Sequence, residues 1–167
     1  MSVCDDLLME FREELKTTRR VLDRVPADKL AWKPHDKSRT LGELAMHIAG
    51  LPAGIAAITA GDSFDVLQGN FAPPQPQATD EIHSALDQTA RDVEKTLTTT
   101  SEERAYAQWR LMRGDTVIFA IPRAVAWRTL MLNHWYHHRG QLSVYLRLLG
   151  VLLPSIYGPS ADENPFA

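Results

Sequence analysis

Residues 122–150 read PRAVAWRTLMLNHWYHHRGQLSVYLRLLG and carry the longest helical pattern in the chain. Apolar side chains recur there every three or four residues, which places them on one face of a helix. Pro122 suits the first turn of a helix, and Gly150 suits the position just past its end. This stretch therefore predicts a long helix from Pro122 to Leu149 with one stripe turned towards a core.

Three further stretches repeat apolar side chains with the same period: residues 7–25, 40–61 and 79–98. Pro26 ends the first of them. Thr40 and Glu43 have the spacing of a capping box, in which each side chain bonds the backbone at the start of a helix. Pro52 lies inside the second stretch and should kink or split that helix. Four amphipathic helices are therefore expected.

Long connections separate these four helices. Residues 26–39 read as a loop or short turn, and residues 62–78, with three prolines, read as a long surface connection. Residues 101–121 look irregular, although β-branched residues around Gly114 and Asp115 allow a short hairpin. Four helices that bury their apolar stripes against one another predict an all-α protein, a four-helix bundle with long connections. A single domain over residues 1–167 is expected.

The composition excludes several classes of protein. The 167 residues are 44% hydrophobic and 23% charged, as in an ordinary globular chain. A net charge of −3 offers no basic surface for nucleic acid or for an anionic membrane. No apolar run in the sequence approaches the roughly 20 residues that span a bilayer. The one cysteine, Cys4, cannot form an internal disulfide, which favours a reducing cytoplasm.

Histidines on the last predicted helix are the main candidates for chemistry. His134 and His138 are four residues apart, so their rings lie one turn apart on the stripe that faces the core. Such a pair suits chelation of a single metal ion. His47, on the inward face of the second predicted helix, supplies a third imidazole. Buried polar rings need partners, so the alternative is that the histidines pair with each other and with Gln141.

The neighbours of these histidines have two interpretations each. His137 competes with His138, because rings three residues apart can also chelate. Gln141 could hydrogen-bond a ligand histidine or a metal-bound water. Tyr145 could stand near an open metal position, or it could be a core residue. Arg139 points away from the proposed metal and either binds a carboxylate on another helix or faces solvent.

A site with three histidines has the pattern of a catalytic metal centre, because it leaves a position open for water or substrate. The Glu-x-x-His spacing of di-iron bundles does not occur in the sequence, which argues against a di-iron centre. Imidazole ligands suit Zn, Ni, Cu and Fe, so a divalent metal ion is expected without a choice among them. A haem held between His47 and one of the other histidines is a third possibility.

Three segments carry a resemblance to a known family: LGELAMHIAG (41–50), NHWYHHRGQLSVYLRLLG (133–150) and PSIYGPSADE (154–163). Together they resemble the DinB/YfiT-like family of bacterial metal-binding four-helix bundles. The last segment is similar to a branch labelled damage-inducible DinB proteins. The resemblance implies one divalent metal held by three histidines, which here are His47, His134 and His138. Relatives include S-transferases and isomerases that use low-molecular-weight thiols, and homodimers are common among them.

These observations lead to two hypotheses about function. The first is a cytoplasmic metal-dependent enzyme, of thiol S-transferase or hydrolase type, that acts on a small-molecule substrate through an ion on the three histidines. The second is a non-catalytic metal-binding or stress-response protein, in which the ion stabilises the helices or reports metal status. A fourth protein ligand would favour the second hypothesis, and an open position favours the first.

Overall fold

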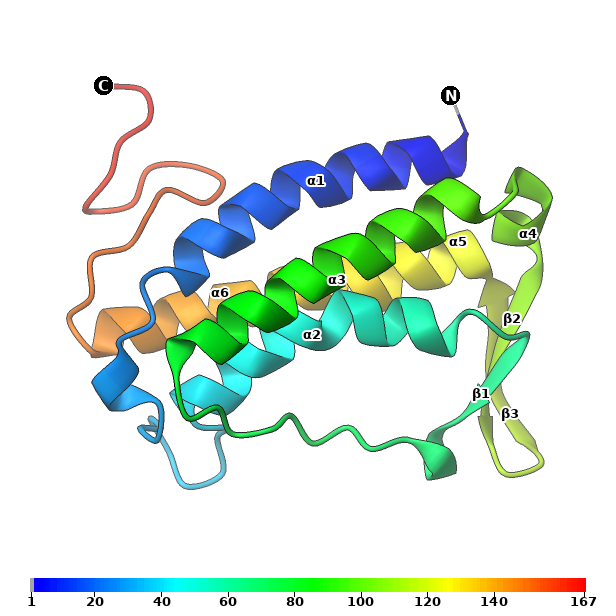
Figure 1. Cartoon of the computed structure of the whole chain (residues 1–167), viewed down its shortest axis with the longest axis horizontal. Coiled ribbons are helices and arrows are strands. Elements are labelled where there is room, and N and C mark those ends of the chain that lie inside the picture. Colours follow the sequence, from blue (N-terminus) through cyan, green and yellow to red (C-terminus); the bar gives the residue numbers. More distant parts are fainter. Residues whose placement is uncertain (1) are drawn as a thin grey trace.

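The computed structural model describes residues 2–167, which form a mostly helical protein with one small sheet (Figure 1). The helices and strands follow in this order: α1 (Val3–Leu22), η1 (Ala27–Lys29), α2 (Leu41–Ile58), β1 (Ser63–Asp65), η2 (Val66–Gln68), α3 (Thr79–Thr99), α4 (Glu102–Tyr106), β2 (Gln108–Arg113), β3 (Thr116–Pro122), α5 (Arg123–Ala126), η3 (Trp127–Asn133) and α6 (His134–Leu148). The segments α5, η3 and α6 follow one another without a break, so the four predicted helices are all present.

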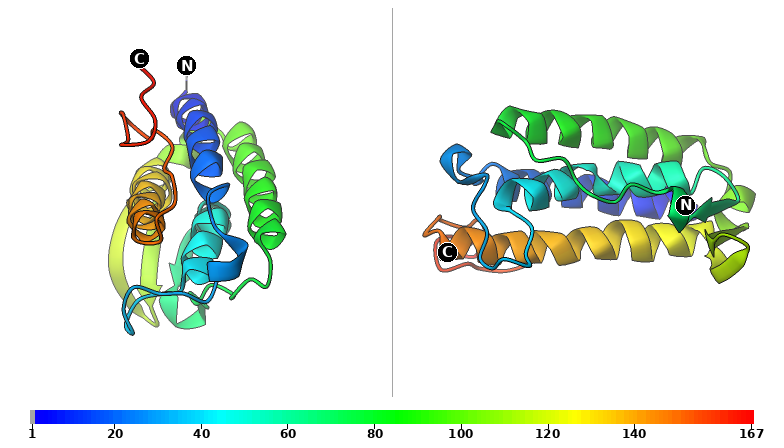
Figure 2. Two further views of the ribbon diagram at one scale, coloured as in Figure 1. Left: turned by 90° about the vertical axis from the view of Figure 1, so that its left-hand side faces the viewer. Right: turned by 90° about the horizontal axis from the view of Figure 1, so that it is seen from below.

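The long helices run side by side along the longest axis of the molecule, as the end-on view shows (Figure 2, left). Helix α2 packs against α3 and α6, and α1 packs against the same two helices from the other side. Phe11, Ile48, Leu86 and Leu142, one from each long helix, are fully buried where these helices meet. Burial of such side chains stabilises the fold by about 1.5–3 kcal/mol each.

A three-stranded sheet lies at the end of the helices where α2 ends and α5 begins (Figure 1). Strands β2 and β3 form the hairpin that the sequence allowed, with Gly114 at a positive φ of 56° in its turn. Strand β1 pairs with β2 in parallel. The prediction of an all-α protein is therefore wrong at this end. Strand β1 has three residues, Ser63–Asp65, which is too short for an alternating pattern to be read from sequence.

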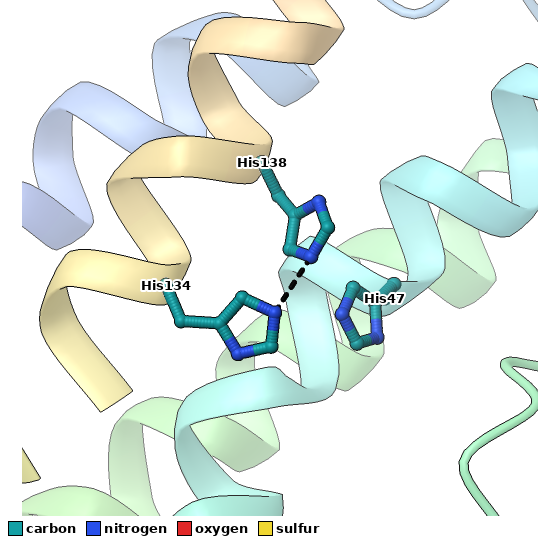
Figure 3. Close-up of side chains that lie close together, drawn as sticks. All are labelled: His47, His134 and His138. Atoms are coloured by element: carbon teal, nitrogen blue, oxygen red, sulfur yellow. Dashed lines mark hydrogen bonds between the residues drawn. The ribbon is translucent and has the colours of Figure 1, made fainter. Parts of the chain in front are cut away.

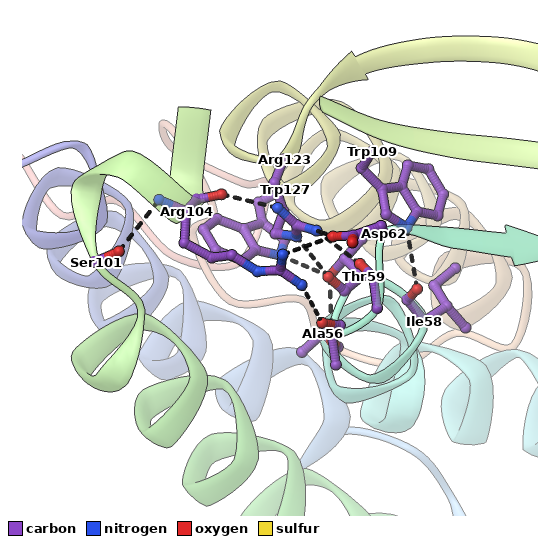
Figure 4. Close-up of polar contacts among 11 residues, drawn as sticks. Ala56, Ile58, Thr59, Asp62, Ser101, Arg104, Trp109, Arg123 and Trp127 are labelled. Carbon is purple, nitrogen blue, oxygen red and sulfur yellow. Dashed lines mark hydrogen bonds and ion pairs between the residues drawn. The ribbon is translucent and has the colours of Figure 1, made fainter. Parts of the chain in front are cut away.

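Arginine and tryptophan side chains fix the carboxyl end of α2 (Figure 4). The last carbonyls of a helix lack partners within it. Here the buried Arg123 side chain donates to the carbonyls of Thr59 and Gly61, each at 2.7 Å. Trp109 donates from its indole nitrogen to the Ile58 carbonyl at 3.1 Å. These contacts tie α2 to the sheet and to the start of α5, which fixes the two helices that carry the histidines.

Helix α2 is continuous across Pro52, so the split that the sequence allowed does not occur, and the kink stays a prediction. A proline lacks the N–H that would bond the carbonyl four residues earlier, which is that of Ile48. Trp135 of α6 supplies the missing donor, since its indole Nε1 lies 2.8 Å from the Ile48 oxygen. The partner from α6 therefore satisfies the one carbonyl that the proline leaves free.

By length and composition, α2 is also the one helix of residues 2–167 that could cross a membrane. The sequence pattern predicts no such stretch. Half of the residues of α2 are buried inside the protein. The core helix of a folded protein has the same apolar length and composition, because it packs against other helices.

The chain after α6 has no regular structure and is held against α1 and α6 by side chains. Arg139, which is 1% exposed, forms an ion pair with Glu14 at 2.6 Å and also hydrogen-bonds the Tyr157 hydroxyl of this tail. Arg20 of α1 donates to Glu163 at 2.7 Å. Of the two alternatives for Arg139, the structure has the first: Arg139 binds a carboxylate on another helix, that of Glu14.

Candidate metal centre

Three histidines from two helices meet in one cluster (Figure 3). His47 comes from α2, and His134 and His138 come from the first two turns of α6. One ring nitrogen from each residue lies within 4.8 Å of the other two. Within residues 2–167, these three form the one group of His, Cys, Asp or Glu side chains close enough to hold a metal ion. His137, the rival of His138, is exposed and lies outside this group.

The hydrogen bonds of the rings leave metal-binding nitrogens free inside the cluster. His138 Nδ1 lies 2.7 Å from Oε1 of Gln141, so this nitrogen carries the proton and Nε2 does not. The two Nε2 atoms of His134 and His138 face each other at 2.8 Å, so a proton on His134 Nε2 can be donated to His138 Nε2, and a cation between the two atoms would take its place. His47 Nε2 is buried and has no hydrogen-bond partner among the described residues.

This donor set fits a divalent metal ion. Unpaired buried polar atoms are costly, and a cation would satisfy the nitrogens of all three rings at once. A metal-ligating histidine commonly donates its other N–H to a carbonyl or carboxylate oxygen, as His138 does to Gln141. A haem fits poorly, because the ring centroids of His47 and His138 are 4.5 Å apart and leave no room for a porphyrin between them.

The electrostatic surroundings keep the rings neutral, which is the form that binds metal. Burial, followed by the nearby Arg39 charge, lowers the pKa of His47 to about 3. Burial lowers the pKa of His138 to about 4, although its hydrogen bond with Gln141 acts in the opposite direction. The pKa of His134 is lowered as well, mainly by burial. Proton competition for these nitrogens is therefore weak near neutral pH.

The two neighbouring residues singled out from sequence lie in different surroundings. Gln141 contacts the cluster directly through His138. The Tyr145 hydroxyl instead donates to the backbone carbonyl of Arg39 at 3.4 Å, and its ring packs edge-on against Trp32. Tyr145 is half-buried and makes no hydrogen bond with the three histidines in the described chain.

A π-helical segment, η3, directly precedes His134 and was not expected from the sequence. A π-helix has wider turns than an α-helix and is frequent at functional sites. A regular helix would put Trp127 on the same side as His134. In the structure, the buried Trp127 donates from its indole nitrogen to the Thr59 hydroxyl, at the carboxyl end of α2, at 2.8 Å.

A pocket of about 580 Å³ adjoins the cluster, and His47 and His134 form part of its wall. Helix α2 and the segment 64–74 provide most of the remaining lining. The sequence predicts only a surface connection over residues 62–78, so this wall was not expected. Its apolar residues Phe64, Val66 and Phe71, unusual in a surface loop, were the available signal.

Comparison with known proteins shows the family of this chain. The model of the DinB family matches residues 1–165, and the chain belongs to this family. The uncharacterized protein YrdA of Bacillus subtilis is 25% identical over 165 residues, which cover 95% of this chain and 90% of YrdA.

Two crystal structures of DinB-like proteins share the fold. The one from Bacillus cereus has a TM-score of 0.72 and 22% identity, and the match covers 92% of this chain and 97% of that protein. YjoA of Bacillus subtilis has a TM-score of 0.68 and 16% identity, with 95% and 98% covered. At these identities the likeness concerns the fold alone.

Proposed function

We propose that this protein is a metal-dependent enzyme that holds one divalent ion through His47, His134 and His138. The observation that carries the proposal is the cluster of three ring nitrogens, one of which is buried with no hydrogen-bond partner in residues 2–167. The four long helices would act as a bundle scaffold for this site, within one domain. Such an ion lowers the pKa of a bound water to about 7 or holds a thiol as its thiolate.

The side chains around the cluster have distinct roles in this proposal. Gln141 accepts the Nδ1 proton of His138 and thereby orients its Nε2 towards the other rings. The adjoining pocket gives a small molecule access to the side of the cluster formed by His47 and His134.

An enzyme is favoured over a purely structural metal site because the cluster offers three protein ligands. Structural zinc sites usually have four, whereas catalytic sites leave a position for water or substrate. Across residues 2–167 the ligand group contains no Cys, Asp or Glu beside the three histidines. The pocket beside the cluster further supports substrate binding rather than metal storage.

The substrate class is the part of the proposal that rests on family resemblance. We extend the proposal to a transferase or hydrolase reaction that uses a low-molecular-weight thiol. We further propose that the protein acts in the cytoplasm and as a homodimer. The donor atoms prefer none of the three ions Zn, Ni and Fe, since imidazole binds each of them.

A turnover screen tests this function. The protein would be stripped of metal, reloaded separately with Zn²⁺, Ni²⁺ and Fe²⁺, and assayed for conjugation of small thiols to electrophiles and for hydrolysis. We expect turnover with one of the ions, its loss in His134→Ala, and its retention in His137→Ala, which removes an exposed ring next to the cluster. Turnover that survives both metal removal and His134→Ala would overturn the proposal.

A further inference from the structure

The pocket beside the three histidines indicates which part of a substrate the protein recognises. We propose that this pocket binds an uncharged, apolar group of the substrate, a hydrocarbon chain or ring, and that Gly50 and Gly54 determine its size. This inference rests on the proposed function, because the reacting group of the same molecule would lie at the histidine cluster. The pocket volume of about 580 Å³ lies within the range of small-molecule sites.

The lining of the pocket selects against charge. Its walls contain no Asp, Glu, Lys or Arg from the described part of the chain. Apart from the two histidines, Gln68 and Asn70 are its polar side chains. An ionic group that entered would lose its hydration without gaining a partner of opposite charge. An apolar group would instead gain free energy in proportion to the surface that it buries.

Gly50 and Gly54 lie one turn apart on the side of α2 that lines the pocket. Glycine within a helix is destabilising relative to alanine, so it needs a reason. Close packing is the usual reason, but a Cβ added at either position would meet no atom of the described residues within 4 Å. The missing side chains therefore leave open space, and that space belongs to the pocket. A larger side chain at these two positions would fill it.

The opposite wall is a strap, residues 66–74, that is tethered at both ends. At one end, Asp65 accepts hydrogen bonds from the backbone N–H groups of Leu67 at 3.0 Å and Gly114 at 3.1 Å. At the other end, Gln75 donates to the Leu30 carbonyl at 3.2 Å. Between the tethers the strap crosses the pocket and turns Phe71 towards Phe64, with ring centroids 6.2 Å apart. The strap thus adds an aromatic surface suited to an apolar ligand.

A series of alkyl hydroxamates tests the inference, because the hydroxamate head binds a metal ion and the chain varies in length. Binding of aceto-, butano- and hexanohydroxamate to the zinc-loaded protein would be measured by calorimetry. Each methylene that enters the pocket should tighten binding about fourfold. A hexanohydroxamate with a terminal carboxylate should lose this gain. Equal affinity along the series, with acetohydroxamate still bound, would contradict the assignment of the pocket to an apolar group. The proposed metal site would not be contradicted by that result.

Glycine variants test where the alkyl chain of the hydroxamate binds in the protein. In the double variant Gly50→Leu, Gly54→Leu, the affinity for acetohydroxamate should stay within about twofold, while the gain with chain length should disappear. Gly140→Leu is the matched control, since Gly140 also lies inside a helix with no atom near its Cβ position but outside the pocket. A chain-length gain that persists in the double variant would contradict the assignment.

A metal-independent probe separates failure of the pocket from failure of the proposed function. The neutral fluorophore N-phenyl-1-naphthylamine should bind wild-type protein and Gly140→Leu with enhanced fluorescence, with or without metal. It should not bind the Gly50→Leu, Gly54→Leu variant, whose fold is checked by circular dichroism. If no hydroxamate binds but the fluorophore does, the result supports the apolar pocket and contradicts the proposed metal-dependent function. If the fluorophore binds all variants equally or none, the pocket assignment is wrong.

Discussion

The indole nitrogen of Trp135 donates a 2.8 Å hydrogen bond to the carbonyl oxygen of Ile48. Each of these residues is the direct neighbour of a clustered histidine, Trp135 of His134 and Ile48 of His47. The carbonyl is free because Pro52 has no N–H to offer it. A buried hydrogen bond therefore sets α6 against α2 at the level of the metal site.

Loss of this hydrogen bond should weaken both the fold and the site. Trp135→Phe keeps an aromatic ring to pack on Phe11 but leaves the Ile48 carbonyl buried without a donor. We expect unfolding free energy to fall by about 1–3 kcal/mol, as for other unsatisfied buried acceptors. Urea unfolding measures this change, and a competition titration would show weaker metal binding.

The proline provides the control for Trp135. Pro52→Ala returns an N–H that can bond the Ile48 carbonyl, so Trp135→Phe should cost about 1 kcal/mol less in that background. A double-mutant cycle with no coupling between the two positions would show that the shared carbonyl is unimportant.

Gln141 should support metal binding through His138. Gln141→Ala removes the acceptor for the His138 Nδ1 proton, so that the ring loses its fixed orientation. Changes of this kind typically weaken metal affinity about 10- to 100-fold. Gln88→Ala is the matched control, because Gln88 bonds Asp92 on the exposed side of α3. Equal metal affinities for the two variants would contradict the role given to Gln141.

Stability of the metal-free protein should depend on pH through the histidine cluster. The pKa is lowered to about 3 for His47 and about 4 for His138, while an unfolded histidine has a pKa near 6.5. Between pH 6.5 and about 4 the unfolded chain binds more protons, so unfolding free energy falls as the pH falls. Urea unfolding at pH 7 and pH 5 in the presence of a chelator measures the slope.

Variants identify the source of that slope. His47→Gln should flatten it, because one buried ring no longer has to become charged. His35→Gln, which changes an exposed loop residue outside the cluster, should leave it as in wild type. A slope that is the same in all three proteins would contradict the assignment to the cluster.

Arg139 should be the main anchor of the carboxyl-terminal tail. Its guanidinium lies over the rings of Tyr136 and Tyr157, 5.2 and 5.0 Å from their centroids, and pairs with Glu14. Arg139→Met would leave the Glu14 carboxylate, which is 15% exposed, without its partner, at a cost of about 3–5 kcal/mol. Arg12→Met breaks an exposed ion pair and should cost less than about 1 kcal/mol. Similar losses in urea unfolding would argue against the buried anchor.

Much of the helical fold could be predicted because its signals are local. The capping box of Thr40 and Glu43 is formed as expected, with bonds of 3.1 and 2.8 Å. The ends of the last helix were marked by Pro122 and Gly150, close to the observed bounds. Strand β1 could not be predicted, because it is defined by its pairing with a hairpin more than forty residues later in the chain.

The three histidines of the cluster could be named from helical spacing, but their surroundings could not. The π-helical segment η3 precedes His134 and could not be predicted, because helical spacing assumes a constant period. The hydrogen bond between Trp135 and Ile48 depends on the packing of two helices, which sequence spacing does not describe. The pocket wall at Phe71 depends on where a proline-rich loop crosses the helices.

Metal analysis tests the central claim most directly. Wild-type protein would be purified without chelators beside His47→Ala, His134→Ala and His138→Ala, with His137→Ala as the neighbouring control, and each would be analysed by elemental mass spectrometry. We predict close to one divalent ion per chain in wild type and in His137→Ala, and its loss from the three cluster variants. Wild-type protein that contains no metal and takes none up on reconstitution would contradict the account.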